Sequence, residues 1–121
     1  MENKNVVKEA VNILAEIPNQ NLFVVHDAVW DRKTKKEQRY TLVGIRVGDV
    51  LRIGLTVCRI DEKFVRSIGR NEAAKKALEG DWTVPVISDD PRITRDYLYM
   101  MNEHVSQNFN RYKRTLAKPK E

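Results

Sequence analysis

The chain has 121 residues, 32% of them charged, and a formal net charge of +5. This length predicts a single domain spanning residues 1–121, and the mildly basic balance favours acidic partners without requiring nucleic acid. The only cysteine, Cys58, excludes an internal disulfide, so we expect a packed thiol in a reducing, cytoplasmic setting. No apolar run approaches the roughly 20 residues of a membrane-spanning helix, and the N-terminal segment does not resemble a signal peptide.

The N-terminal part predicts a helix followed by a strand and a charged loop. Apolar residues recur at helical spacing over residues 5–17, and Pro18 ends the pattern. The segment 22–30 is rich in β-branched and aromatic residues, which is typical of a strand. The following RKTKKEQ is interpreted as a solvated hairpin tip, with an electrostatic contact as the alternative.

Two further strands are expected in YTLVGIRV and VLRIGLTVCRI. Each alternates apolar and other residues, and Gly48-Asp49 between them is a strong signal for a tight hairpin. The three strands are therefore predicted to form an antiparallel meander with one apolar face. Gly44 and Gly54 should lie on the other face, where glycine often marks close approach by a ligand or another backbone.

The C-terminal half predicts a helix, a short strand and a last helix. Asp61 is a suitable N-cap for a helix over residues 62–78, which Gly80 would end. The segment WTVPVI should be an edge strand, because Pro85 has no N–H to donate. SDDPRI then signals the next helix start, with Asp90 as the N-cap and Pro91 at the first helical position.

The last helix is predicted to run over residues 92–117, about 26 residues or roughly 39 Å. Its apolar residues recur at spacings of three and four along a stripe longer than a small sheet can cover. We expect the excess to pack on a second copy of the chain, giving a homodimer. The alternative is packing on the chain's own sheet and first helix alone. The fold class is then α+β, a small antiparallel sheet with flanking helices and a long C-terminal dimerisation helix.

The motif FVRSIGRNEAAKKA at residues 64–77 suggests an anion site. Phe64, Val65 and Ile68 are expected to point to the core. The neighbouring face of the helix carries Arg66, Gly69, Arg70, Ala73 and Ala77. Small residues beside two arginines leave room for a phosphate held by both guanidinium groups. Alternatively, the small residues admit another helix, and the arginines pair with Asp61, Glu62 or Glu72.

The start of the last helix offers a second group of candidates. Arg92 and Arg95 lie in its first turn, where the helix dipole disfavours cations. Either both serve an anionic ligand, or Asp96 neutralises Arg92 at i+4. Trp82 is either part of the core or a flat surface for a base. In the tail NRYKRTLAKPK, Arg111 and Arg114 belong to either a phosphate-contacting basic surface or a solvated helix end.

Signatures of catalysis and of cofactors are missing from the sequence. One cysteine and two separated histidines, His26 and His104, give no metal-ligand spacing. GxSxG, GxxxxGK[ST] and GxGxxG do not occur, and the adjacent Asp89 and Asp90 before a proline are typical of a helix cap. We therefore expect a protein without a cofactor that is not an enzyme.

The element order, FVRSIGRNEAAKKA and ISDDPRITRDYLYMM resemble the first described family of Thoeris anti-defence proteins. The resemblance covers most of the chain. It implies a small phage-encoded sponge that acts in the bacterial host cytoplasm and sequesters a cyclic ADP-ribose isomer without cleaving it. It also implies dimers with interlocked long helices, and larger assemblies that hold cyclic oligonucleotides at a second site.

A sponge of this kind needs donors for a diphosphate, a flat partner for adenine and polar groups for ribose. The residues proposed for these roles are Phe64, Arg66, Arg70, Asn71, Trp82, Asp90, Arg92, Arg95 and Tyr97. Two other classes remain open. The runner-up is a basic nucleic-acid-binding or protein-blocking accessory module, which would bind in a salt-dependent manner. The third is a small nucleotide hydrolase, which would consume its ligand.

Overall fold

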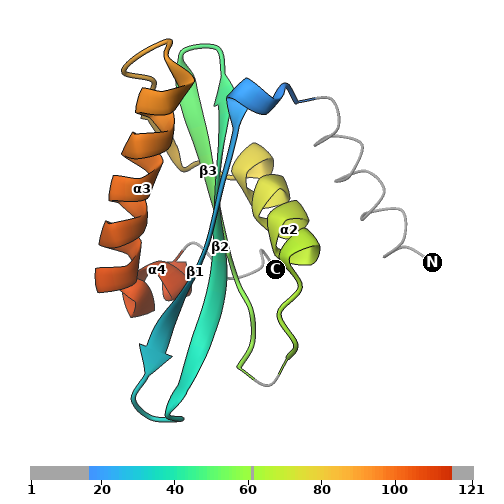
Figure 1. Cartoon of the computed structure of the whole chain (residues 1–121), viewed down its shortest axis with the longest axis vertical. Coiled ribbons are helices and arrows are strands. Elements are labelled where there is room, and N and C mark those ends of the chain that lie inside the picture. Colours follow the sequence, from blue (N-terminus) through green and yellow to red (C-terminus); the bar gives the residue numbers. More distant parts are fainter. Residues whose placement is uncertain (1–16, 61, 116–121) are drawn as a thin grey trace, which may run out of the picture.

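The fold is α+β, with a four-stranded antiparallel sheet between helices on both faces (Figure 1). A computed structural model describes residues 17–60 and 62–115, with the side chains of residues 114 and 115 left out. The helix expected over residues 5–17 and the Asp61 cap therefore lie outside the described residues, apart from Ile17. Among the described helices, none combines the length and the apolar character needed to cross a membrane.

The sheet has the strand order β1-β2-β3-β4. After a short 3-10 turn (Asn19–Asn21), the strands are β1 (Leu22–Asp31), β2 (Lys36–Val47), β3 (Val50–Val57) and β4 (Thr83–Pro85). The three strands and the tight turn are confirmed, since Val47 pairs with Val50 and Gly48 adopts a φ of 61° in the two-residue loop. Their bounds differ: β2 begins at Lys36, inside the segment predicted as a solvated loop, because residues 36–38 pair with β1, and β3 ends at Val57. Pro85 lies in the edge strand β4, as its missing N–H requires.

Both faces of the central strands are buried, so the prediction of one apolar face is wrong. The two-residue loop pairs Val43 with Gly54, which places odd-numbered residues of β2 beside even-numbered residues of β3. Val43 and Ile45 therefore pack on one face, whereas Leu51, Ile53 and Leu55 pack on the other. For the same reason Gly44 and Gly54 face opposite sides, and each face of the sheet needs its own helical cover.

One face is covered by α2 (Arg66–Glu79), which lies against β2 and β3 at close range (Figure 1). A Cβ on Gly54 would lie 1.9 Å from the carbonyl oxygen of Ala73 and 2.5 Å from the backbone nitrogen of Ala77. The helix backbone thus rests directly on the strand, and a buried row of Gly69, Ala73, Ala74 and Ala77 makes this approach possible. The small residues predicted to admit another helix, or to leave space for a ligand, admit the sheet instead.

The beginning of α2 also differs from the prediction. The helix begins at Arg66 rather than at residue 62, and its N-cap is Val65, which provides no side-chain cap. Val65 and Ile68 were expected in the core, but both are exposed because the alanines occupy the sheet-facing side. Phe64 precedes the helix and is half-buried. The backbone N–H groups of the first turn of α2 therefore have no side-chain acceptor at the N-cap position.

The opposite face is covered by α3 (Pro91–Gln107) and α4 (Phe109–Thr115), and no single helix spans 92–117. The predicted start is confirmed, since Asp90 accepts a hydrogen bond from the backbone N–H of Arg92 and Pro91 is the first helical residue. The helix is interrupted at Asn108, whose backbone and side-chain nitrogens donate to the carbonyl of His104. The break lets Phe109 pack on Tyr40, with ring centroids 5.3 Å apart.

The long dimerisation helix is therefore not formed within the described residues. Leu98, Val105 and Phe109 are buried in the chain's own core, which corresponds to the alternative of packing on the chain's own sheet. Two successive side-chain hydrogen bonds, running from the core to the exposed Asp27, also hold α3 in place. Tyr40 donates its hydroxyl proton to Asn102 at 2.6 Å, and Asn102 donates to Asp27 at 2.8 Å. Hydrogen bonds of this kind define the lateral position of the helix on the sheet.

Gly54→Ala should destabilise the protein strongly, because the added methyl group overlaps the backbone of α2. We expect a loss of about 3 kcal/mol in the free energy of unfolding, measured by denaturant titration. Gly44→Ala is the matched control. Its methyl group would meet only the side chain of Leu51, at 3.3 Å, and should cost less. Equal stability of Gly54→Ala and the parent protein would contradict the described contact.

Candidate functional site

Two of the proposed arginines lie together beside the first turns of α2. Arg66 and Arg70 are one helical turn apart and exposed, and neither forms an ion pair or hydrogen bond with any residue in the described part of the chain. Glu62, one of the acidic partners considered from the sequence, pairs with Arg59 at 3.7 Å instead. As far as the described residues go, both arginines are therefore available to an external anion.

Aromatic and imidazole rings lie next to these arginines. His26 of β1 and Phe64 meet edge to face, with ring centroids 5.6 Å apart. The guanidinium carbon of Arg39, on β2, lies 5.4 Å from the centroid of the Phe64 ring, a cation–π arrangement. We name this group of five residues, His26, Arg39, Phe64, Arg66 and Arg70, the α2 arginine surface.

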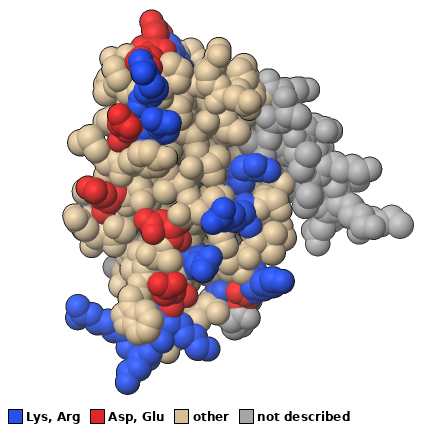
Figure 2. Space-filling model, in the orientation of Figure 1, with Lys and Arg blue, Asp and Glu red and all other residues tan. Residues whose placement is uncertain are grey.

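The α2 arginine surface is open. The cavity beside Phe64 and Gly69 measures about 110 Å³, which is too small to enclose a nucleotide. A bound nucleotide would therefore lie over the surface, with its phosphates on the arginines and only a small group inserted. Figure 2 shows Lys and Arg side chains gathered over α2, separate from a second group at the end of the β1–β2 hairpin.

The imidazole of His26 is held in a cationic environment. Its Nδ1 lies 2.8 Å from the hydroxyl of Thr41, a buried residue on the neighbouring strand. Partial burial lowers the pKa of His26 below its usual 6.5, and the positive charges of Arg66 and Arg70 lower it further. Burial and the two guanidinium charges together thus favour the neutral form of this imidazole.

The remaining proposed residues do not join the α2 arginine surface. Asn71 lies on α2, but its side-chain oxygen is buried and accepts no hydrogen bond from the described residues. Arg92 pairs with Asp90 at 3.3 Å rather than with the predicted Asp96, and Asp90 also caps α3. Arg95 is exposed on the same helix. These α3 residues lie on the opposite face of the sheet from α2 (Figure 1).

The proposed aromatic residues Trp82 and Tyr97 also lie on the α3 face, where both are half-buried against the core. Trp82 stacks on Tyr112 of α4, with ring centroids 5.5 Å apart. One face of the indole is therefore already covered by another ring. A single chain does not bring Trp82 or Tyr97 to the α2 arginine surface.

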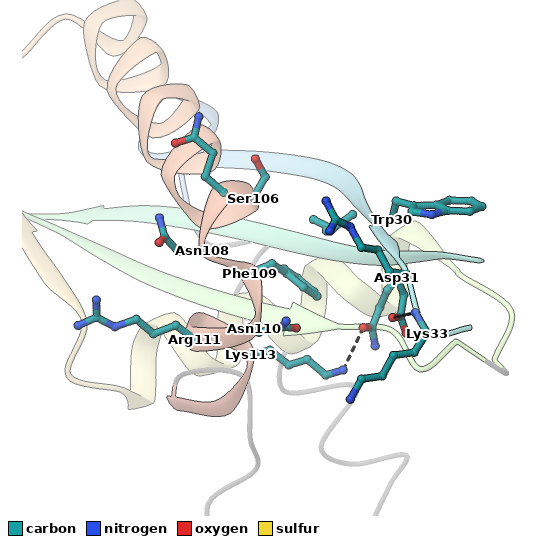
Figure 3. A pocket seen from close by; sticks show the side chains of 13 residues that line it. Trp30, Asp31, Lys33, Ser106, Asn108, Phe109, Asn110, Arg111 and Lys113 are labelled. Atoms are coloured by element: carbon teal, nitrogen blue, oxygen red, sulfur yellow. Dashed lines mark hydrogen bonds between the residues drawn. The ribbon is translucent and has the colours of Figure 1, made fainter. Parts of the chain in front are cut away.

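A larger cavity lies between the β1–β2 hairpin and the α3–α4 junction. We name it the hairpin cleft; it measures about 790 Å³ and is lined by cations from both sides. Arg32 and Lys33 belong to the hairpin, and Lys113 extends from α4 toward the strands, where its Nζ donates to Gln38 at 3.0 Å (Figure 3). Phe109 forms an apolar part of the wall.

The predicted basic surface is only partly located by the structure. Arg111 lines the hairpin cleft but extends to the other side of α4 from Lys113 in Figure 3. The side chain of Arg114 lies outside what is described. Among the described residues that line the cleft, Asp31 is the one acid. Hydrogen bonds from the backbone N–H of Lys33 and the hydroxyl of Thr34 lower its pKa.

Sequence reasoning missed His26 and Arg39 as members of a site, because their neighbours depend on strand register. His26 pairs with Thr41 and Ala28 with Arg39, which places both side chains on the α2 face. The Gly48-Asp49 turn fixes the β2–β3 register, but the β1–β2 register depends on where the four-residue loop 32–35 ends. The charged composition of RKTKKEQ was the available signal for the hairpin cleft.

Comparisons with protein-family models, curated proteins and solved structures found no match to this chain. In the described part of the chain, no group of three or more His, Cys, Asp or Glu residues is placed to hold a metal ion.

The lowered pKa of His26 predicts a loss of stability in mild acid. Its contribution is fully present above the unfolded pKa of about 6.5 and decreases as pH falls through the lower folded value. Between about pH 7 and pH 5, the free energy of unfolding should therefore fall less in His26→Asn than in the parent protein. Denaturant titrations at several pH values measure this. An identical pH dependence in both proteins would contradict the described environment of His26.

Proposed function

We propose that this protein is a phage anti-defence sponge that binds a cyclic ADP-ribose-type nucleotide without cleaving it and thereby blocks Thoeris immunity. We assign the binding to the α2 arginine surface. The observation that carries the proposal is the exposed pair Arg66 and Arg70, which have no partner among the described residues, beside the ring of Phe64. The resemblance of the sequence motifs to the anti-defence family supports the choice of nucleotide.

The chemistry of a diphosphate fits this group of side chains. Guanidinium groups donate paired hydrogen bonds to phosphate oxygens, and two of them one turn apart can hold adjacent phosphates. The N-terminal end of α2 adds a partial positive charge, and no acidic residue occupies its first turn. Phe64 and the cation of Arg39 offer a ring and a planar group on which a base can stack.

We also propose that the protein acts as a homodimer, and the placement of the candidate residues gives this a structural reason. Arg66 and Arg70 lie on one face of the sheet, whereas Trp82, Arg92 and Arg95 lie on the other (Figure 1). A pocket that combines the two groups requires two chains. The contact between the two chains would not use a single helix over residues 92–117, since α3 and α4 are separated at Asn108.

The hairpin cleft favours a second candidate function, binding of single-stranded nucleic acid by a basic accessory module. Its lining holds Arg32, Lys33, Arg111 and Lys113 against the single acid Asp31, and Trp30 is 59% exposed at its edge. Cations along a groove with an exposed aromatic ring are the usual elements of sequence-tolerant binding to single strands. The cleft and the α2 arginine surface share no residue, so the two functions can be tested separately.

Replacing Arg66 and Arg70 together by alanine should weaken binding of cyclic ADP-ribose isomers by about 100-fold or more, because two charge-assisted contacts are lost. Calorimetric titration of the folded variant measures this. Arg32→Ala with Lys33→Ala removes the same charge from the hairpin cleft, which shares no residue with the α2 arginine surface, and is the matched control. Unchanged affinity in the Arg66 and Arg70 variant, or an equal loss of affinity in the control, would refute the assignment.

For the second candidate, Arg32→Ala with Lys33→Ala should reduce the salt dependence of binding to a single-stranded oligonucleotide. Each lost phosphate contact lowers the slope of log affinity against log salt by about 0.7, so we expect a change of about 1.4. Lys36→Ala with Arg95→Ala removes two cations outside the cleft lining and should leave the slope closer to that of the parent protein. Equal slopes for both variants would contradict a specific role of the cleft.

A further inference from the structure

His26 is positioned as a further member of the anion site. Its ring orientation is fixed from two sides, by the hydrogen-bonding distance of 2.8 Å between Nδ1 and the Thr41 hydroxyl and by the edge-to-face contact with Phe64. Thr41 in turn lies directly against α2 at Gly69, where only a glycine leaves room for its hydroxyl, since a Cβ there would lie 2.5 Å from the hydroxyl oxygen. The imidazole is thus held in place beside the two arginines before any ligand arrives.

Within the described ranges, the charged groups that act on His26 are cationic. Arg66 and Arg70 act on it from α2, and Arg39 of β2 lies over the adjoining Phe64 ring. On its own strand, the neighbours that share its face are Val24 and Ala28, which carry no charge. Asp27 points to the other face, where it accepts a hydrogen bond from Asn102. A proton on His26 therefore lacks a compensating negative charge from the described residues of the free protein.

We propose that His26 is a third cationic ligand of the anion that Arg66 and Arg70 hold, and that it takes up a proton when the anion binds. The inference rests on the proposed function and adds a regulation to that same site. An anion between the arginines supplies the missing negative charge, so it favours the protonated imidazole. By linkage, a proton on His26 must then favour the anion by the same factor. Capture of the nucleotide becomes stronger as the surroundings become more acidic.

The pH dependence of ADP-ribose binding tests this inference. The diphosphate of ADP-ribose keeps a constant charge in the range used, so a proton taken up on binding belongs to the protein. One coupled proton changes affinity by at most tenfold per pH unit, and we expect the dissociation constant to fall about 3- to 10-fold from pH 7.5 to 5.5. Calorimetry in two buffers with different ionisation enthalpies gives the number of protons taken up.

The two histidines of the chain provide a matched pair of variants. Nδ1 of His26 lies 2.8 Å from a threonine hydroxyl, and Nδ1 of His104 lies 2.7 Å from the hydroxyl of Tyr112. Asparagine can retain either hydrogen bond but does not titrate. His26→Asn should abolish the proton uptake and most of the pH dependence, whereas His104→Asn should retain both. Proton NMR should show the pKa of His26 rising when ADP-ribose is added.

The possible outcomes separate the inference from the proposed function. Binding that depends on Arg66 and Arg70 but takes up no proton, or is equally pH-dependent in His26→Asn, would overturn the role of His26 and leave the site intact. No binding of ADP-ribose at either pH would overturn the diphosphate site and the inference with it. Proton uptake that is lost only in His26→Asn, together with the rise in its pKa, would establish the inference.

Discussion

The contact between the backbone of α2 and Gly54 of β3 is the constraint on which the rest of the structure depends. A helix that lies directly on a strand needs small residues along its inner side, and Gly69 and the alanines supply them. The inner side is thereby filled, so the large and charged residues of α2 must lie outward. Arg66 and Arg70 then stand above the sheet beside His26, and the cationic surface is a consequence of how closely the helix packs.

Much of the fold could be predicted from local signals in the sequence. The Gly48-Asp49 turn, Pro85 in the edge strand and Asp90 as N-cap were each recognisable because one or two residues determine the geometry. The prediction of a single apolar face failed because alternation within each strand was considered without the register between strands. The prediction of a continuous last helix failed because Asn108 can cap a helix and because burial of Phe109 favours a turn there.

The candidate site was predictable only in part, for a physical reason. Arg66, Arg70 and Phe64 are close in sequence, so one helical period brings them together. His26 and Arg39 join them through strand pairing and the position of α2 on the sheet, which periodicity does not encode. Trp82 and Arg92 were grouped with Arg66 and Arg70 by chemical type, but the topology places them on the opposite face of the sheet.

The most direct test of the proposed sponge uses the unmodified protein. Purified protein is mixed with cyclic ADP-ribose isomers and filtered, the retained fraction is heated, and the released material is analysed by mass spectrometry. The proposed binding of the diphosphate to the α2 arginine surface, without reaction, predicts that one isomer is retained and that heating releases it intact. Absence of any retained isomer would contradict the proposal, and release of a cleaved product would identify a hydrolase instead.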